Sequence, residues 1–306
     1  MTTNRGYRIR QTRDEKIIHV VSIVVITLFM LLCFYPFWNV FINSIAPKEE
    51  VTQSVYFFPK NPTFDVYKDV LRDGSLIHSV LVSIARTVIS TLGCVFFSSM
   101  FAYLITQKNL PGRTFFYRFA IITMYVGGGL IPWYLTMKLY GLYNNFWVYV
   151  APCMFSAYYA ILIKAFIESL PPSLEEAAKI DGAGFFVLFT QIILPLSKPI
   201  LATVALYQAV GQWNSYQDNY LLVQDSNLQT VQMTLYNYIK QADAIASAML
   251  QATASGADIS DAAQQNMTPD AVRNATTILS MLPIMLVYPF LQKYFAKGVM
   301  LGAVKG

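Results

Sequence analysis

Residues 176–199, EAAKIDGAGFFVLFTQIILPLSKP, form a polar, helix-forming insertion between two long apolar segments. We predict that Ser173 caps the first helix of this insertion and that Glu176, three residues later, returns a hydrogen bond to the cap. Asp181-Gly182 is expected to end this helix after about two turns, because glycine accepts a positive φ. A second short apolar helix with three phenylalanines follows. Prolines separate the insertion from the segments on either side: Pro171, Pro172, Pro195 and Pro199. The stretch therefore predicts two short helices, set at an angle on one side of a membrane.

The composition indicates a lipid environment. Hydrophobic residues make up 55% of the 306 residues, charged residues only 13%, and the mean hydropathy is +0.44. Soluble domains usually carry about a quarter charged residues. The three cysteines and two histidines are scattered, so we expect no metal site, no disulfide framework and no catalytic residue. One all-α membrane domain over residues 17–296 is the expected organisation.

Six apolar segments are long enough to be membrane spans. The first exceeds the roughly 20 residues that cross a bilayer, and it lacks the cleavage site of a signal peptide. Residues 1–16 and 297–306 are predicted to be short terminal segments outside the bilayer. The predicted spans are 17–45, 76–105, 115–139, 146–167, 193–223 and 275–295.

The distribution of Lys and Arg predicts the orientation. If the N-terminus is cytoplasmic, fourteen basic residues fall on the cytoplasmic side and seven on the other. Acidic residues run the opposite way, six inside and eleven outside. The net charge of +5 is therefore a topology signal rather than a nucleic-acid footprint. Both termini and the 176–199 stretch are predicted to be cytoplasmic.

The same stretch resembles the cytoplasmic loop signature of the membrane-spanning subunits of binding-protein-dependent ABC importers. The alternative interpretation is an amphipathic loop helix that only packs under the bundle. The resemblance implies a type I importer permease fold, with a coupling loop at 172–192 seated on an ATPase subunit. The matching residues are Glu176, Ala177, Ala178, Asp181, Gly182, Ala183, Phe189, Ile192, Leu194, Pro195 and Pro199.

Within this coupling loop, side-chain chemistry predicts separate roles. The alanines leave a shallow surface that enters a groove, and Phe185, Phe186 and Phe189 supply apolar anchors. Glu176 is expected to pair with a basic residue at the rim, and Asp181-Gly182 to fix the bend.

The resemblance also implies the partners. The chain has no G-x-x-x-x-G-K-[ST] phosphate loop, so it is not expected to bind ATP by that route. ATP and Mg²⁺ would be bound by two partner ATPase subunits. A second, homologous permease and an extracellular or periplasmic solute-binding protein would complete a complex in the bacterial cytoplasmic membrane, with no role for nucleic acid.

Further matches lie in the carbohydrate branch of this family, which implies an oligosaccharide substrate. A non-sugar solute is the alternative within the family. An ion-coupled secondary transporter is disfavoured because the spans contain almost no acidic residue before Asp218, and an intramembrane enzyme is disfavoured because no nucleophile has a paired histidine. The matching segments are 110–113, 128–132, 213–215, 281–283 and the ending KGVMLGAVKG at 297–306.

Polar residues within the spans are candidates for the substrate pathway, since such side chains usually face a cavity or the bundle interior. The fifth span supplies Gln208, Gln212, Trp213 and Asn214, and the third supplies Gly128 and Trp133 beside a run of glycines that predicts a broken helix. For Asp218 and Asn219, near the outer surface, helix–helix hydrogen bonding is the favoured role.

Two features leave alternatives open. Arg86 is the one basic residue inside a span, and it is expected to attract an acidic sugar, to pair with a partner permease, or to extend outward. Residues 240–268 are expected to be an external helical hairpin or a mobile loop.

Overall fold

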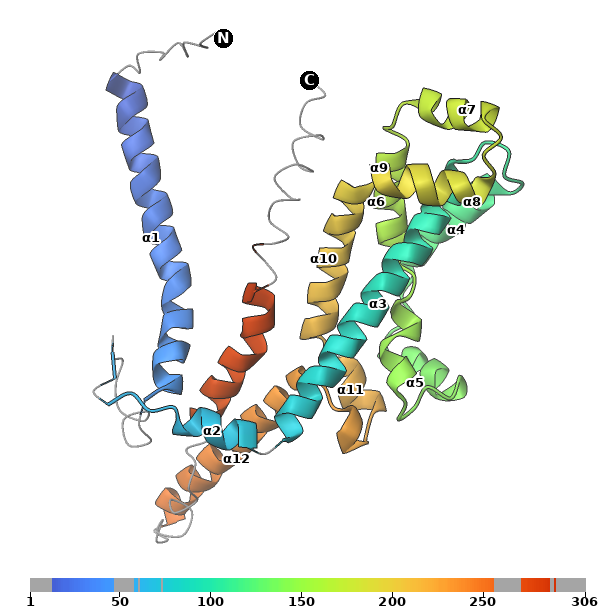
Figure 1. Ribbon diagram of the computed structural model, residues 1–306. Coiled ribbons are helices and arrows are strands. Elements are labelled where there is room, and N and C mark those ends of the chain that lie inside the picture. Colours follow the sequence, from blue (N-terminus) through green and yellow to red (C-terminus); the bar gives the residue numbers. More distant parts are fainter. Residues whose placement is uncertain are drawn as a thin grey trace.

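The computed structural model describes residues 13–46, 58–59, 61–72, 74–255, 271–286 and 289, and within these ranges every regular element is helical (Figure 1). The longer helices are α1 (Arg13–Ser44), α2 (Asp65–Arg72), α3 (Ser75–Thr106), α4 (Arg113–Tyr125), α5 (Leu130–Leu139), α6 (Ala157–Ile167), α7 (Pro172–Ile180), α10 (Lys198–Asn214), α11 (Gln217–Leu222), α12 (Val231–Ser255) and a helix over Ala271–Leu286. The shorter ones are η1 (Phe146–Tyr149), η2 (Ala151–Cys153), α8 (Phe185–Val187), the π-helix η3 (Leu188–Ile193), α9 (Leu194–Leu196) and η4 (Ser226–Leu228).

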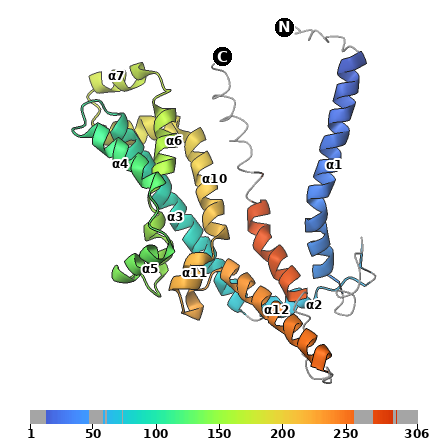
Figure 2. The ribbon, with the colours of Figure 1, turned by 180° about the vertical axis from the view of Figure 1, so that it is seen from behind.

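Helix α3 lies at the centre of the bundle and packs against α10, α6, α12 and α4 (Figures 1 and 2). Its inward face carries small residues at helical spacing, which lets neighbouring backbones approach closely. This face also hydrogen-bonds to other elements: the Ser83 hydroxyl accepts from the Val231 amide at 2.9 Å, and the Ser98 hydroxyl from the Ser156 amide at 3.2 Å. The small buried residues are Ser79, Ser83, Ser90, Cys94, Ser98 and Ala102.

Helix α1 stands apart from the rest of the bundle in both views (Figures 1 and 2). Its residues from Arg13 to Phe37 are exposed, and burial begins only near its end. There the Ser44 hydroxyl lies 2.6 Å from the Tyr67 hydroxyl of α2. A helix that is apolar on all sides and exposed is suited to lipid or to a neighbouring membrane helix.

The predicted first and second spans agree with α1 and α3, the two helices that are long and apolar enough to cross a membrane unbroken. Two other predicted spans, 115–139 and 146–167, are broken helix pairs: α4 and α5 are bent by 119°, and the η1–η2 segment and α6 by 40°. The bounds predicted for the fifth span, 193–223, do not match one helix: the 185–196 segment is bent by 80° to α10, and α10 ends at Asn214. The structure therefore holds up to five spans by length and composition. The sixth is described only as the helix to Leu286, so the count of six stays a prediction.

The two ends of the bundle carry different elements. The start of α1 and the α7 segment lie at one end, while α2, α5, α11 and α12 lie at the other (Figure 1). This arrangement agrees with the predicted placement of residue 13 and of the 172–192 loop on one side. Of residues 240–268, those up to Ser255 continue α12 as a helix; the remainder, like residues 1–12 and 297–306, lies outside the described residues.

The α4–α5 break depends on Gly129, which has φ +80° and ψ 178°, a conformation open essentially to glycine alone. We expect Gly129→Ala to destabilise the protein by about 1–3 kcal/mol. Thermal unfolding of the purified protein in detergent would show this as a lowered Tm. Gly127→Ala is the matched control, because Gly127 has neither a positive φ nor an atom within 4 Å of an added Cβ. Equal Tm values for the two variants would contradict the prediction.

Candidate functional site

The α7 helix begins two residues earlier than its sequence predicts, because Pro171 and not Ser173 flanks its start. Pro172 is its first residue, and Pro171 occupies the N-cap position. Proline is favoured as the first residue of a helix, because its φ is already helical and its missing N–H would have no partner within the helix. No side chain caps this helix start in the described structure. The predicted capping box between Ser173 and Glu176 is therefore wrong, because Ser173 already lies inside the first turn.

The end of α7 confirms the predicted break at Asp181-Gly182. Gly182 has φ +79°, and its amide donates to the Lys179 carbonyl at 3.1 Å. The Ala183 amide donates to the Ala178 carbonyl at 2.9 Å. These two bonds form a Schellman motif, which turns the chain sharply toward α8.

Glu175, and not Glu176, is the carboxylate of α7 that contacts the bundle. The Glu175 carboxylate lies 2.8 Å from the Lys179 ammonium and accepts a hydrogen bond from the Tyr103 hydroxyl of α3 at 3.5 Å. Partial burial would raise the pKa of Glu175, but hydrogen bonds from Lys179, Gln107 and Tyr103 outweigh it, so the pKa lies below its ordinary value. The stabilisation from the charged Glu175 carboxylate is therefore present at neutral pH and is lost as the pH falls through that lowered pKa.

The phenylalanines after the turn divide into two groups. Phe189 is fully buried and stacks on Tyr103 with ring centroids 5.8 Å apart, and Phe185 stacks on the same ring at 4.8 Å while staying 41% exposed. Phe186 is exposed. The prediction that Phe189 anchors a partner is therefore wrong, because its ring packs inside the chain's own core.

The other predicted coupling residues divide by exposure. Ala178 lies on the buried face of α7 and packs against the core of the chain, so it too is unavailable to a partner. Ala183 and Leu194 are half-buried. The exposed members are Glu176, Ala177, Asp181, Gly182, Phe185, Phe186 and Pro195.

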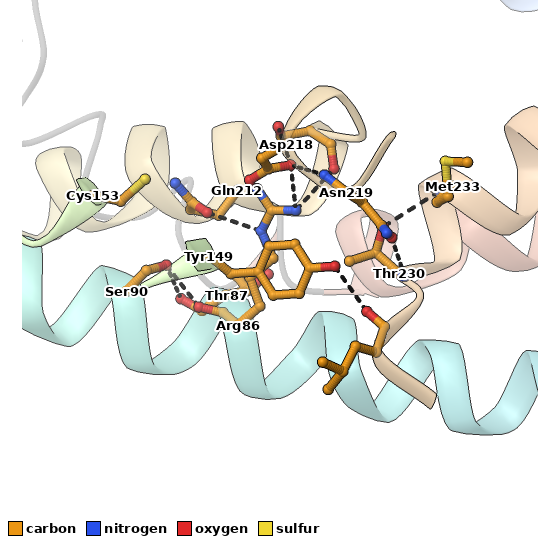
Figure 3. Close-up of polar contacts among 12 residues, drawn as sticks. Arg86, Thr87, Ser90, Tyr149, Cys153, Gln212, Asp218, Asn219, Thr230 and Met233 are labelled. Atoms are coloured by element: carbon orange, nitrogen blue, oxygen red, sulfur yellow. Dashed lines mark hydrogen bonds and ion pairs between the residues drawn. The ribbon is translucent and has the colours of Figure 1, made fainter. Parts of the chain in front are cut away.

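A second polar cluster joins α3 to the break between α10 and α11 (Figure 3). Arg86 is 1% exposed, and its guanidinium donates to both carboxylate oxygens of Asp218, at 3.1 and 2.5 Å. It also donates to the Gln212 side-chain oxygen at 3.0 Å and to the Ser215 carbonyl at 3.1 Å. The ring of Tyr149 covers it, with 4.7 Å from the guanidinium carbon to the ring centroid. This cluster provides the buried arginine with a charge partner and hydrogen-bond acceptors from the same chain.

None of the three roles predicted for Arg86 is therefore right. Its charge is matched by Asp218 of the same chain, so it is not free for an acidic sugar or a partner permease, and it does not reach outward. The signal that could have found this pair is that ionisable groups within spans usually pair with one another. For Asp218 itself, helix–helix hydrogen bonding was the favoured role, and its bonds to Arg86 of α3 agree with that prediction.

Two fifth-span candidates are also structural. Gln212 is buried against Arg86, and Trp213 is buried with its ring N–H donating to the Ser280 carbonyl at 2.9 Å. Neither lines an open surface, so their assignment to the substrate pathway is wrong. Asn219, as predicted, serves helix packing: its side-chain oxygen accepts from the Thr230 amide at 2.8 Å.

The remaining pathway candidates are accessible. Asn214 and Gly128 are exposed, Trp133 is half-buried, and Gln208 is half-buried with its amide 3.5 Å from the Cys153 carbonyl. Gly128 lies in the confirmed break between α4 and α5. Exposed Tyr207, Gly211 and Asn214 follow one another at helical spacing along a single face of α10.

Comparisons with known proteins agree with this architecture. The model of the family described as "Binding-protein-dependent transport system inner membrane component" matches residues 10–301. A polygalacturonan/rhamnogalacturonan transport system permease protein, YtcP, from Bacillus subtilis (strain 168), is 36% identical over 91% of this chain and 95% of its own. Protein LplC of the same organism is 38% identical over 89% of each chain.

A solved structure is similar throughout. It is a chain from the crystal structure of a bacterial ABC transporter involved in the import of the acidic polysaccharide alginate. The two chains superpose with a TM-score of 0.82 and share 29% identity, over 94% of this chain and 99% of the other.

The buried pair generates a stability prediction. Arg86→Met should destabilise the protein by about 3–5 kcal/mol, because it leaves the Asp218 carboxylate buried without its partner. The double variant Arg86→Met with Asp218→Leu should recover most of this loss, since an apolar replacement of both partners is often neutral. Thermal unfolding in detergent would measure both, with exposed Arg118→Met as the control. A Tm for Arg86→Met equal to that of the control would show that the pair contributes little.

Proposed function

The chain belongs to the family of binding-protein-dependent transport system inner membrane components, and we propose that it is the permease subunit of an ATP-driven importer that carries an oligosaccharide across the membrane. The observation that carries this proposal is the exposed α7 turn at one end of a lipid-suited helical bundle. The oligosaccharide assignment is supported by the similarity to a permease named for polygalacturonan and rhamnogalacturonan and to an alginate importer. On this proposal the chain forms the pathway, and the catalytic residues for ATP hydrolysis belong to its partners.

Helix α7 and the following turn would couple this chain to an ATPase subunit. Glu176, Ala177 and Asp181 are exposed on the outer side of the loop, and Phe186 extends an apolar ring beside them. Such a surface, small residues next to an aromatic anchor, fits a groove on a partner. Two partner ATPase subunits would bind ATP and Mg²⁺. Their ATP-driven closure on each other would pull the coupling loops together.

The proposed complex includes a second, homologous permease and an external solute-binding protein. This complex would assemble at the bacterial cytoplasmic membrane. The present chain would contribute six spans, and the distribution of its basic residues predicts that both of its termini lie in the cytoplasm. Exposed α1 is available to lipid and to the second permease. Asn214 and Gln208 of α10, with Gly128 and Trp133 near the α4–α5 break, would face the substrate pathway.

A secondary transporter driven by an ion gradient receives no support from the described residues. Coupling by protons or sodium ions commonly uses a carboxylate inside the membrane. In the described part of the helical bundle, the buried carboxylate is Asp218, and it is held by Arg86. Its charge is therefore already compensated.

Two substitutions in the α7 turn test the coupling role. Gly182→Pro cannot keep φ at +79°, and Glu176→Lys reverses an exposed charge. We expect both variants to insert and assemble normally while ATP hydrolysis no longer drives uptake, with uptake reduced at least tenfold. Measurements of ATPase activity and oligosaccharide uptake in proteoliposomes holding the full complex would check this.

Matched controls are available in the same loop. Gly184 has φ −72° and open space around an added Cβ, so Gly184→Ala should leave transport unchanged. Ser173→Lys adds a charge to the exposed first turn of α7 without touching the Gly182 bend. Normal uptake by both Gly182→Pro and Glu176→Lys would refute the coupling role of this turn.

A further inference from the structure

Three tyrosines from two helices converge at the end of the bundle opposite α7. Tyr216, just before α11, stacks on Tyr236 of α12 with ring centroids 5.1 Å apart and an interplanar angle of 17°. Tyr220 of α11 meets the same ring edge-on at 5.4 Å. Figure 1 shows α11 and α12 next to each other at this end. The rings thus form one continuous aromatic surface built from two elements.

This surface is open rather than part of a core. Tyr216 is 42% exposed and Tyr220 is 54% exposed. Their neighbours are polar, with exposed Gln217 beside them and half-buried Gln232 one turn before Tyr236 on the same face of α12. Exposed tyrosine rings with amide groups alongside suit a sugar, because C–H groups pack on the negative ring face while hydroxyls take hydrogen bonds from amides. Tyr216 and Tyr220 offer this exposed ring surface, and half-buried Tyr236 supports it from behind.

Lys240 places a positive charge at the edge of this surface. It follows Tyr236 by one turn of α12, and its ammonium lies 5.6 Å from the centroid of that ring. The side chain is exposed, and no carboxylate of the described residues lies within ion-pair distance of it. Arg86, by contrast, is buried against Asp218. Lys240 is therefore a cation on this aromatic surface that remains available to an anionic ligand.

We propose that Tyr216, Tyr220, Tyr236 and Lys240 form an entry platform for an acidic oligosaccharide, in which Tyr216 and Tyr220 stack on sugar faces, Tyr236 holds these two rings in place, and Lys240 pairs with a uronate carboxylate. The inference rests on the proposed transport function and adds the charge class of the substrate. The platform adjoins the exposed face of α10, because Asn214 precedes Tyr216 by two residues. A sugar chain leaving the platform would therefore meet the proposed pathway directly.

The test compares an acidic and a neutral sugar of the same length. The full complex in lipid nanodiscs is assayed for binding of trigalacturonate and galactotriose by equilibrium dialysis, and proteoliposomes with the solute-binding protein are assayed for uptake of both. Lys240→Gln should weaken trigalacturonate binding about threefold to fivefold, as for an exposed ion pair, and leave galactotriose unchanged. Tyr220→Ala should weaken both sugars, because it removes a stacking face.

Lys138→Gln is the matched control. Its ammonium also lies over a tyrosine ring, that of Tyr143 at 5.7 Å, and α5 is at the same end of the bundle, but outside the α11–α12 surface. It should affect neither sugar. High salt should weaken only the trigalacturonate binding of the unaltered complex.

The outcomes separate the two proposals. If the unaltered complex takes up neither sugar nor any other oligosaccharide, the proposed function fails. If it transports oligosaccharides but Lys240→Gln behaves like Lys138→Gln, or lowers both sugars equally, the platform is refuted while the transport function stands. Unchanged binding in Tyr220→Ala would refute the stacking role and assign these rings to an interfacial aromatic belt.

Discussion

The ion pair between Arg86 and Asp218 fixes the centre of this bundle. A guanidinium at membrane depth is costly unless a carboxylate and further acceptors surround it. Here Asp218, Gln212 and the Ser215 carbonyl meet that need, and the Tyr149 ring covers the remaining side. All of these acceptors come from α10, α11 and the link between them. The need to satisfy one arginine therefore joins the central helix to the point where the predicted fifth span breaks.

Helix α3 connects this cluster to the α7 loop. Tyr103 stands near one end of α3, held between Phe185 and Phe189, and Arg86 lies 17 positions earlier, about 25 Å away along the helix. A continuous helix is stiff over that length, and its small-residue face is tightly packed. Helix α3 therefore connects the α7 loop and the α10–α11 break through one continuous element.

The charge distribution around the substrate candidates changes their interpretation. Arg86 is the cation that the sequence suggested for an acid-binding site, but its charge is paired with Asp218 of the same chain. The exposed cation next to exposed aromatic rings is instead Lys240 of α12, at the start of the 240–268 region for which the sequence left a hairpin and a mobile loop equally open. Polar composition alone did not distinguish these places, because Ala, Gln and Asp are compatible with either. The burial and the ion pair of Arg86, against the exposure of Lys240, distinguish the two sites.

Length and hydropathy by themselves determined the lipid environment and the positions of α1 and α3, because a run of twenty apolar residues has few structural solutions. The family followed from a different signal, the resemblance of residues 176–199 to a known cytoplasmic loop signature. The Gly182 turn and the glycine break after α4 followed from backbone sterics in the same way. Only the tertiary structure decided which side chains are buried and which remain exposed. It buried Ala178, Phe189, Gln212 and Trp213, which local chemistry had marked as contact residues, and it paired Arg86 with Asp218 across 132 positions. Pairings between residues so distant in the chain depend on how helices pack, and no local pattern contains that information.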